Sequence, residues 1–285
     1  DKSILDPGIE MLEERVGIPV VGVTPYLHIE VEDEDSLTER FCGNQEVAAI
    51  DLAVIRLPRI SNFTDFNPFE SMEGVSLRYV TSVSELKNPD MILLPGTKNT
   101  MEDLKWLRQS GLENAICKAT AEGKIIFGIC GGYQMMGARL EDPEGIEGNL
   151  PAVPGLGLLP QCTVIEQEKV TKQSRFTFRN GSPMVCKGYE IHMGQTSLLG
   201  NAPESPVALL EDGRKDGYYL NDHCWGSYMH GILDNPEVLD NLAKGFNKET
   251  GNAPFDYAAF KEEQYDKLAD LVRKHVDMEY IYSTL

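Results

Sequence analysis

Apolar residues in the first half of the chain gather in short runs that alternate with segments of helical periodicity. Four runs have the length and composition of strands: 48–56, 75–79, 91–94 and 124–128. Helical patterns fill the intervals and follow the last run: 82–86, 101–110, 112–122 and a stretch that begins at Tyr133. This alternation predicts an α/β fold, in which helices flank a mostly parallel sheet.

The two ends of the chain and its second half do not continue this regular alternation of strands and helices. Near the start, residues 8–16 have a helical pattern, and the β-branched run 18–23 is typical of a buried parallel strand. From residue 158 onward the pattern predicts shorter strands, which we expect to form the far half of the sheet and antiparallel additions to it: 162–166, 175–179, 187–193, 218–220 and 224–228. Two helices are predicted to close the chain, at 235–246 and 257–275. A domain break is expected near 42–45.

Composition argues against several classes of function. With 45 acidic and 26 basic residues, the chain has a formal net charge of −19, which disfavours binding to nucleic acid. The six cysteines form no C-x-x-C pair, so no zinc or thioredoxin-like motif is indicated and we expect no metal site. No apolar run approaches the roughly 20 residues of a membrane helix, and a reducing cytoplasm is the expected location.

The strongest chemical signal is a cysteine between a predicted strand and a predicted helix. The segment Gly128-Ile129-Cys130-Gly131-Gly132 has the G-x-C-x-G form of a nucleophile elbow, in which small neighbours let a tight turn close. The N–H of Gly131 would then point to where an oxyanion forms. Most single cysteines are inert core residues, but the flanking glycines at a strand-to-helix turn favour a nucleophile here.

A second turn ends the neighbouring strand at Pro95-Gly96-Thr97. The backbone N–H of Gly96 or Thr97 can supply the other oxyanion donor, since both strands end at the same edge of a parallel sheet. An ordinary turn, with Thr97 or Asn99 capping the next helix, explains this segment equally well.

A base for Cys130 has to come from one of five histidines: His28, His192, His223, His230 and His275. His230 lies at the end of a late strand and is followed by glycine, the position from which an imidazole can face the elbow. His192 is the rival base or a substrate contact. His275 falls on the apolar stripe of the last helix and is interpreted as structural.

These residues resemble the class I, triad-type glutamine amidotransferase domain, which has a flavodoxin-like sheet. Four further strings narrow the resemblance to the cobyric acid synthase family, over essentially the whole chain: 56–66 (RLPRISNFTDF), 94–100 (LPGTKNT), 188–194 (GYEIHMG) and 226–231 (GSYMHG). The resemblance implies that Cys130 and His230 hydrolyse glutamine. It also implies that the ammonia serves ATP- and Mg²⁺-dependent amidation of the b, d, e and g carboxylates of adenosylcobyrinic acid a,c-diamide.

The resemblance also implies a domain organisation. Residues 1–46 are similar to the end of an ATP-dependent synthetase domain plus a linker, 47–248 to the amidotransferase domain, and 249–285 to a C-terminal helical tail. No G-x-x-x-x-G-K-[ST] motif is present, so we expect no cofactor in this chain and a corrinoid site in a missing N-terminal part.

Class I amidotransferases usually carry a glutamate two residues after the catalytic histidine, where this chain has Ile232. The cobyric acid synthase branch lacks this acid, and Asp65 and Glu190 are the candidates for orienting His230. Three alternatives remain open: a sibling amidotransferase (of the cobyrinic acid a,c-diamide synthase or isoglutaminyl synthase type), a cysteine hydrolase of similar fold, and a non-catalytic docking module.

Overall fold

The computed structural model describes residues 2–26, 29, 48–179, 184–246 and 256–285. The chain divides into two compact units. One is formed by the two ends, Asp1–Val31 with Ala258–Leu285, and the other by Glu32–Tyr257. His28, Cys42 and the break expected near 42–45 lie outside the described residues.

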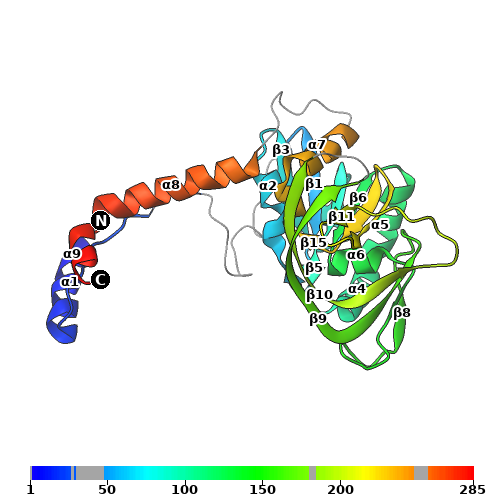
Figure 1. Ribbon diagram of the computed structural model, residues 1–285, viewed down its shortest axis with the longest axis horizontal. Helices are drawn as coiled ribbons and strands as arrows, with labels where there is room; N and C mark the ends of the chain where they lie inside the picture. The colour runs from blue at the N-terminus through cyan, green and yellow to red at the C-terminus, as the bar shows by residue number, and fades with distance from the viewer. Residues whose placement is uncertain (1, 27–28, 30–47, 180–183, 247–255) are drawn as a thin grey trace. The chain divides into compact units, whose positions relative to one another are not determined.

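The larger unit is built on a six-stranded sheet (Figure 1). Its strands, in spatial order, are β13 (Tyr218–Asn221), β14 (Cys224–Ser227), β6 (Ile125–Ile129), β4 (Met91–Leu94), β1 (Ile50–Ile55) and β3 (Val75–Val80). All neighbours are parallel except β13 and β14. Every residue of β1, β4 and β6 is buried, as expected for strands covered on both faces. The α/β class predicted from the sequence is therefore confirmed.

Helices and short turns connect these strands: η2 (Phe63–Phe66), α2 (Asn67–Glu70), α3 (Val83–Leu86), α4 (Thr100–Gln109), α5 (Leu112–Ala121), α6 (Gly131–Met136), η3 (Ile232–Asp234) and α7 (Pro236–Gly245). Side chains define several of their starts, because Ser82 accepts the N–H of Glu85 and Asn99 accepts that of Glu102. The helices predicted at 82–86, 101–110, 112–122 and 235–246 all match within one or two residues.

A second sheet, of mixed direction, is dominated by one long hairpin (green in Figure 1). Its strands are β7 (Arg139–Glu141), β8 (Ala152–Pro154), β9 (Gln161–Phe178), β10 (Val185–Leu198), β11 (Ala208–Leu210), β12 (Lys215–Asp216) and β15 (Met229–His230). The two strands predicted at 162–166 and 175–179 are thus one strand. Its middle is polar and exposed, so the sequence there has no apolar alternation to reveal it.

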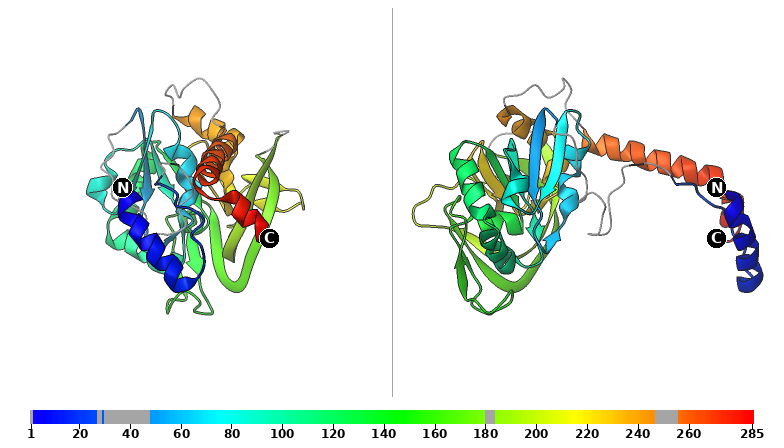
Figure 2. Two further views of the ribbon diagram at one scale, coloured as in Figure 1. Left: turned by 90° about the vertical axis from the view of Figure 1, so that its left-hand side faces the viewer. Right: turned by 180° about the vertical axis from the view of Figure 1, so that it is seen from behind.

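The unit formed by the two ends contains α1 (Lys2–Val16), α8 (Tyr257–His275) and α9 (Met278–Ser283), whose colours mark both termini in Figure 2. The predicted helix at 257–275 has the predicted bounds. The strand predicted at 18–23 is not formed, and Gly22 makes only an isolated antiparallel bridge with Val276. An apolar β-branched run becomes a strand only where another strand pairs with it along its length.

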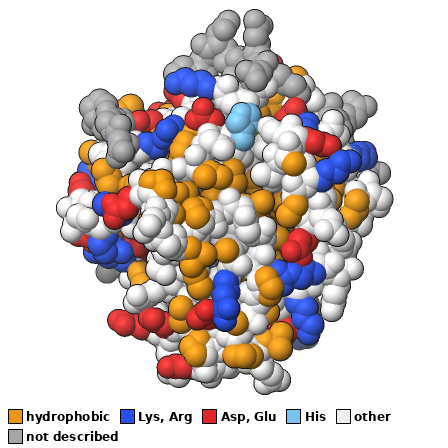
Figure 3. All heavy atoms as spheres, turned by 90° about the vertical axis from the view of Figure 1, so that its right-hand side faces the viewer, with side chains coloured by type: hydrophobic (Ala, Val, Ile, Leu, Met, Phe, Trp, Pro, Cys, Tyr) orange, Lys and Arg blue, Asp and Glu red, His pale blue; other side chains and the backbone are white. Residues whose placement is uncertain are grey.

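The surface of the molecule mixes charges of both signs. On the face drawn in Figure 3, hydrophobic side chains gather near the middle, and acidic and basic side chains share the surrounding rim. Within the part of the chain that is described, no helix combines the length and apolar character needed to cross a membrane.

Candidate active site

Cys130 lies at the turn between β6 and α6, with φ 52° and ψ −112°. A non-glycine residue in this region costs roughly 1–3 kcal/mol, and such strain is found mostly at functional sites. The turn needs glycine at position 132, because a Cβ there would lie 2.0 Å from the carbonyl oxygen of Leu94. Small residues next to Cys130 therefore allow this conformation, and the turn places the sulfur at the carboxyl edge of the sheet.

Strand pairing brings His230 to the same edge. β14 runs parallel to β6 with Ser227 beside Ile129, and the N–H of Cys130 donates to the Ser227 carbonyl at 2.9 Å. Three residues later the chain reaches His230, whose ring stacks on Tyr189 with centroids 5.1 Å apart. The structure thus brings the predicted nucleophile, which follows β6, and the predicted base, which follows β14, to the same edge of the sheet.

Asp65 completes the arrangement at His230. Its Oδ2 lies 2.7 Å from His230 Nδ1, and its Oδ1 accepts the N–H of Gly231 at 2.9 Å. Both side chains are almost fully buried, at 1% and 3% exposure. The acid lies in η2 (Phe63–Phe66), between β2 and α2.

The electrostatics favour a proton on His230. Burial by itself lowers the pKa of His230, but the charge and hydrogen bond of Asp65, together with Cys130, raise it to about 10. Nε2 is buried and has no hydrogen bond of ordinary geometry within the described residues. With Nδ1 held by Asp65, Nε2 is the nitrogen left to exchange a proton with Cys130.

Two short strands lie beside the Cys130 turn: β2 (Ile60–Ser61) and β5 (Gly96–Thr97), which pair antiparallel. The N–H of Lys98 donates to the Arg59 carbonyl at 3.0 Å, so the preceding N–H, that of Thr97, points away from β2. The nitrogen of Thr97 lies 3.1 Å from the place that a Cβ on Gly131 would take. Of the two residues suggested by the sequence, Thr97 has the better-directed donor.

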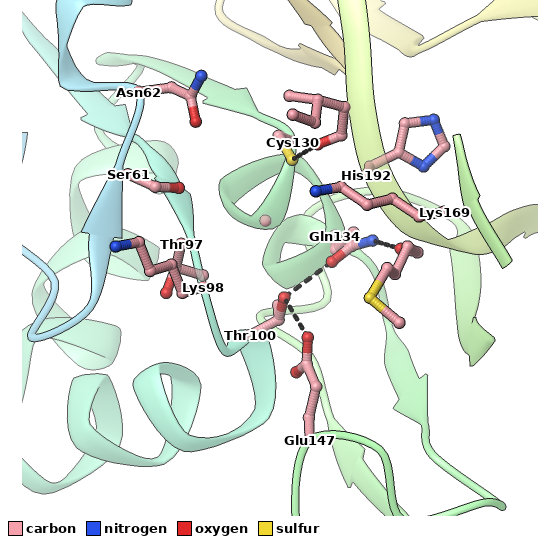
Figure 4. A pocket seen from close by; sticks show the side chains of 13 residues that line it. Ser61, Asn62, Thr97, Lys98, Thr100, Cys130, Gln134, Glu147, Lys169 and His192 are labelled. Atoms are coloured by element: carbon pink, nitrogen blue, oxygen red, sulfur yellow. Dashed lines mark hydrogen bonds between the residues drawn. The ribbon is translucent and has the colours of Figure 1, made fainter. Parts of the chain in front are cut away.

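Cys130 opens into a cavity of about 340 Å³ (Figure 4). This is the lower end of the size range of small-molecule pockets. Its charged lining side chains are Lys98, Lys169 and Glu147, and its other lining residues include Ser61, Asn62, Thr97, Thr100, Gly131, Gln134, Ile191, His192 and Met193. The cavity therefore offers both signs of charge beside a nucleophile.

Glu190 and His192 form a separate buried group. Glu190 accepts two hydrogen bonds from Arg214, at 2.9 and 2.6 Å, and lies 3.8 Å from His192 Nε2. Burial raises the pKa of Glu190, but hydrogen bonds from His192 and Arg214 outweigh it and lower the pKa to about 2. His192 lines the cavity and stacks on Tyr228, with centroids 3.7 Å apart. Of the two candidate acids, only Asp65 contacts His230.

Sequence reasoning missed most of the residues that line the cavity, and Gln134 is the most highly connected of them. Gln134 follows Cys130 by one helical turn, accepts from Thr100 Oγ1 at 2.9 Å, and donates to the Met193 carbonyl at 2.8 Å and to Tyr228 Oη at 3.1 Å. It ties α6 to α4 and β10 at the floor of the cavity (Figure 4). Its position four residues after the elbow cysteine was the available signal.

Solved structures of other proteins have a similar fold. A solved glutamine amidotransferase aligns with 69% of this chain and 99% of its own at a TM-score of 0.51 and 19% identity. PurLQS from Thermotoga maritima aligns with 69% of this chain and 98% of its own at a TM-score of 0.53 and 18% identity. At these identities the likeness shows the fold alone. The sheet, the elbow at Cys130 and the buried His230–Asp65 pair together define a glutamine amidotransferase-like α/β domain.

The sequence comparisons identify a particular family within this class. Residues 51–238 match the CobB/CobQ-like glutamine amidotransferase domain, and the chain belongs to that family. Three relatives named cobyric acid synthase match over 100% of this chain: those of Parabacteroides distasonis at 61% identity, Bacteroides fragilis at 49% and Ruminiclostridium cellulolyticum at 46%. The chain spans 58% of the length of each of these relatives.

Proposed function

We propose that this chain hydrolyses glutamine with Cys130 as nucleophile, His230 as general base and acid, and Asp65 as the residue that orients His230. The observation that carries the proposal is the strained cysteine and the buried His230–Asp65 pair at one edge of the sheet, beside one cavity. Nucleophile, base and orienting acid are the parts that acyl transfer from an amide requires.

In the proposed reaction, Cys130 Sγ attacks the side-chain carboxamide carbon of glutamine, with the thiol proton held on His230 Nε2. The N–H groups of Gly131 and Thr97 stabilise the oxyanion, and losing one such donor typically costs about 3 kcal/mol. The C–N bond then breaks, and His230 returns the proton to the leaving nitrogen to give ammonia. Water activated by His230 hydrolyses the thioester, which releases glutamate and restores the thiol.

The cavity suits the rest of the substrate. Glutamine carries an α-carboxylate and an α-ammonium group, and the lining provides Lys98 and Lys169 for the first and Glu147 for the second. His192 contributes a wall of the cavity, where we assign it to substrate contact and not to proton transfer. Its Nδ1 is buried and has no hydrogen-bond partner among the described residues.

For the longer protein we propose the activity of the relatives' name, cobyric acid synthase. Ammonia from this site would amidate the b, d, e and g carboxylates of adenosylcobyrinic acid a,c-diamide in cobalamin biosynthesis. ATP and Mg²⁺ would be bound by the part that this chain does not span. Among the described residues, no three His, Cys, Asp or Glu side chains lie together as metal ligands.

A glutamine-mimicking alkylator followed by mass spectrometry tests the nucleophile. We expect one adduct, on Cys130, formed rapidly in the wild type and at least a thousandfold more slowly in His230→Ala. An adduct elsewhere, or none, would refute the glutaminase assignment. Amidation by the longer protein, with cobyrinate offered against its a,c-diamide, tests the substrate: preference for cobyrinate would assign the sibling a,c-diamide synthase activity instead.

A further inference from the structure

The C-terminal segment 258–285 makes defined contacts with the start of the chain. Val276 forms an antiparallel bridge with Gly22, and the N–H of Asp277 donates to the Val21 carbonyl at 2.7 Å. The contact is close, because a Cβ on Gly22 would lie 2.3 Å from the carbonyl oxygen of His275. A glycine is therefore required where these two ends of the chain meet.

The junction between α8 and α9 is itself ordered by specific hydrogen bonds. The N–H of Val276 continues the α8 pattern by donating to the Val272 carbonyl at 2.9 Å. Asp277 then caps α9 by accepting the N–H of Tyr280 at 2.9 Å. Two consecutive residues thus end one helix, bridge to residues 21–22 and begin the next helix. A loosely attached tail has no need of such a turn.

The unit formed by the two ends has no hydrophobic core of its own. Among its described residues only Gln264 is buried. Apolar side chains on and after α1 are instead exposed: Ile4 by 80%, Leu12 by 53%, Val16 by 55% and Ile18 by 64%. A unit of this size needs buried apolar surface to fold, so this face requires a cover.

The length of the relatives identifies the cover. About two fifths of their length lies outside the match with this chain, since the chain spans 58% of it. α1 has four acidic and two basic residues, which disfavours a membrane surface as the partner. The run 18–23 makes one bridge among the described residues and has the composition of a strand, so it is suited to join a sheet supplied by that missing part.

We infer that residues 258–285 are a structural part of the ATP-dependent portion of the longer protein and not a tail of the glutaminase. In this arrangement the chain runs from the synthetase portion into the glutaminase and returns, so that α8 and α9 help to complete the synthetase fold around residues 18–23. The inference rests on the proposed function only in calling the missing portion a synthetase.

Hydrogen exchange gives a test that needs no variant. Amides of residues 18–23 and 276–285 should exchange at least tenfold more slowly in the longer protein than in this 285-residue chain, because the missing part covers them. Equal rates would overturn the inference. Protection of the 285-residue chain that rises with its concentration would also overturn it, since a second copy would then be the cover.

A variant of the longer protein tests the contact. Gly22→Ala places a Cβ against the His275 carbonyl. We expect Gly22→Ala to lower ammonia-dependent amidation at least tenfold and to leave the glutaminase rate, measured on the same protein, within twofold. Unchanged amidation in Gly22→Ala would refute the role of the contact. Failure of the wild type to amidate a corrinoid would refute the proposed function, and the exchange comparison would still decide this inference.

Discussion

Replacing Asp65 by asparagine tests the most specific contact in the site, which is the one between Asp65 and His230. Asp65 holds Nδ1 of His230 at 2.7 Å, and the pKa of His230 is raised from 6.5 to about 10. A difference of that size corresponds to about 5 kcal/mol in favour of the imidazolium, part of which comes from Cys130. Assigning most of it to Asp65 predicts a loss of about 4 kcal/mol, or roughly a thousandfold in kcat.

Hydrogen-bond chemistry explains why the Asp65→Asn substitution should lower kcat. The amide of an asparagine can donate to Nδ1, which would place the ring proton on Nε2 and leave that nitrogen unable to accept from Cys130. Glutamate release from glutamine measures kcat, and NMR titration of His230 measures its pKa. Glu190→Gln is the control for a buried carboxylate, because it should leave the His230 titration unchanged. An Asp65→Asn variant with more than a tenth of wild-type kcat and an unshifted His230 titration would refute the reasoning.

Three further predictions follow from other contacts. The pKa of His230 in the folded protein lies above its unfolded value, so the Asp65–His230 pair should stabilise the protein fully below about pH 6.5. As the pH rises to about 10 the protein should lose this contribution, which amounts to up to about 5 kcal/mol. Denaturation measured across that pH range should show no such loss in Asp65→Asn. Gly132→Ala should destabilise the larger unit by about 3 kcal/mol, whereas Gly148→Ala, with its nearest atom at 3.8 Å, should not, and equal urea midpoints would contradict this. Lys169→Met should raise the KM for glutamine roughly fivefold at nearly constant kcat, and a fall in kcat alone would argue against a binding role.

The elements that position the site could be predicted because their signals are local. The strand before Cys130, the glycines around it and the helix after it lie within a dozen residues, and β1, β4 and β6 are buried on both faces and read as continuous apolar runs. The β9–β10 hairpin was seen only in pieces, since the middle of β9 lies exposed and carries polar residues. The strand expected at 18–23 failed for the opposite reason: its residues favour a strand, but no strand among the described residues pairs with them along their length.

The acid that orients His230 could not be chosen from the sequence, because the choice depends on strand register. Tyr189 pairs directly with His230 across β10 and β15, which places Tyr189 on the face of His230 and turns Glu190 to the opposite face. A shift of one residue would have brought Glu190 to the imidazole and removed Tyr189. Asp65 reaches His230 from 165 positions away, through η2 and the short β2–β5 pair that also directs the Thr97 N–H. One two-residue ladder therefore helps to place both the Asp65 carboxylate and the Thr97 N–H, and neither position can be inferred until the chain is folded.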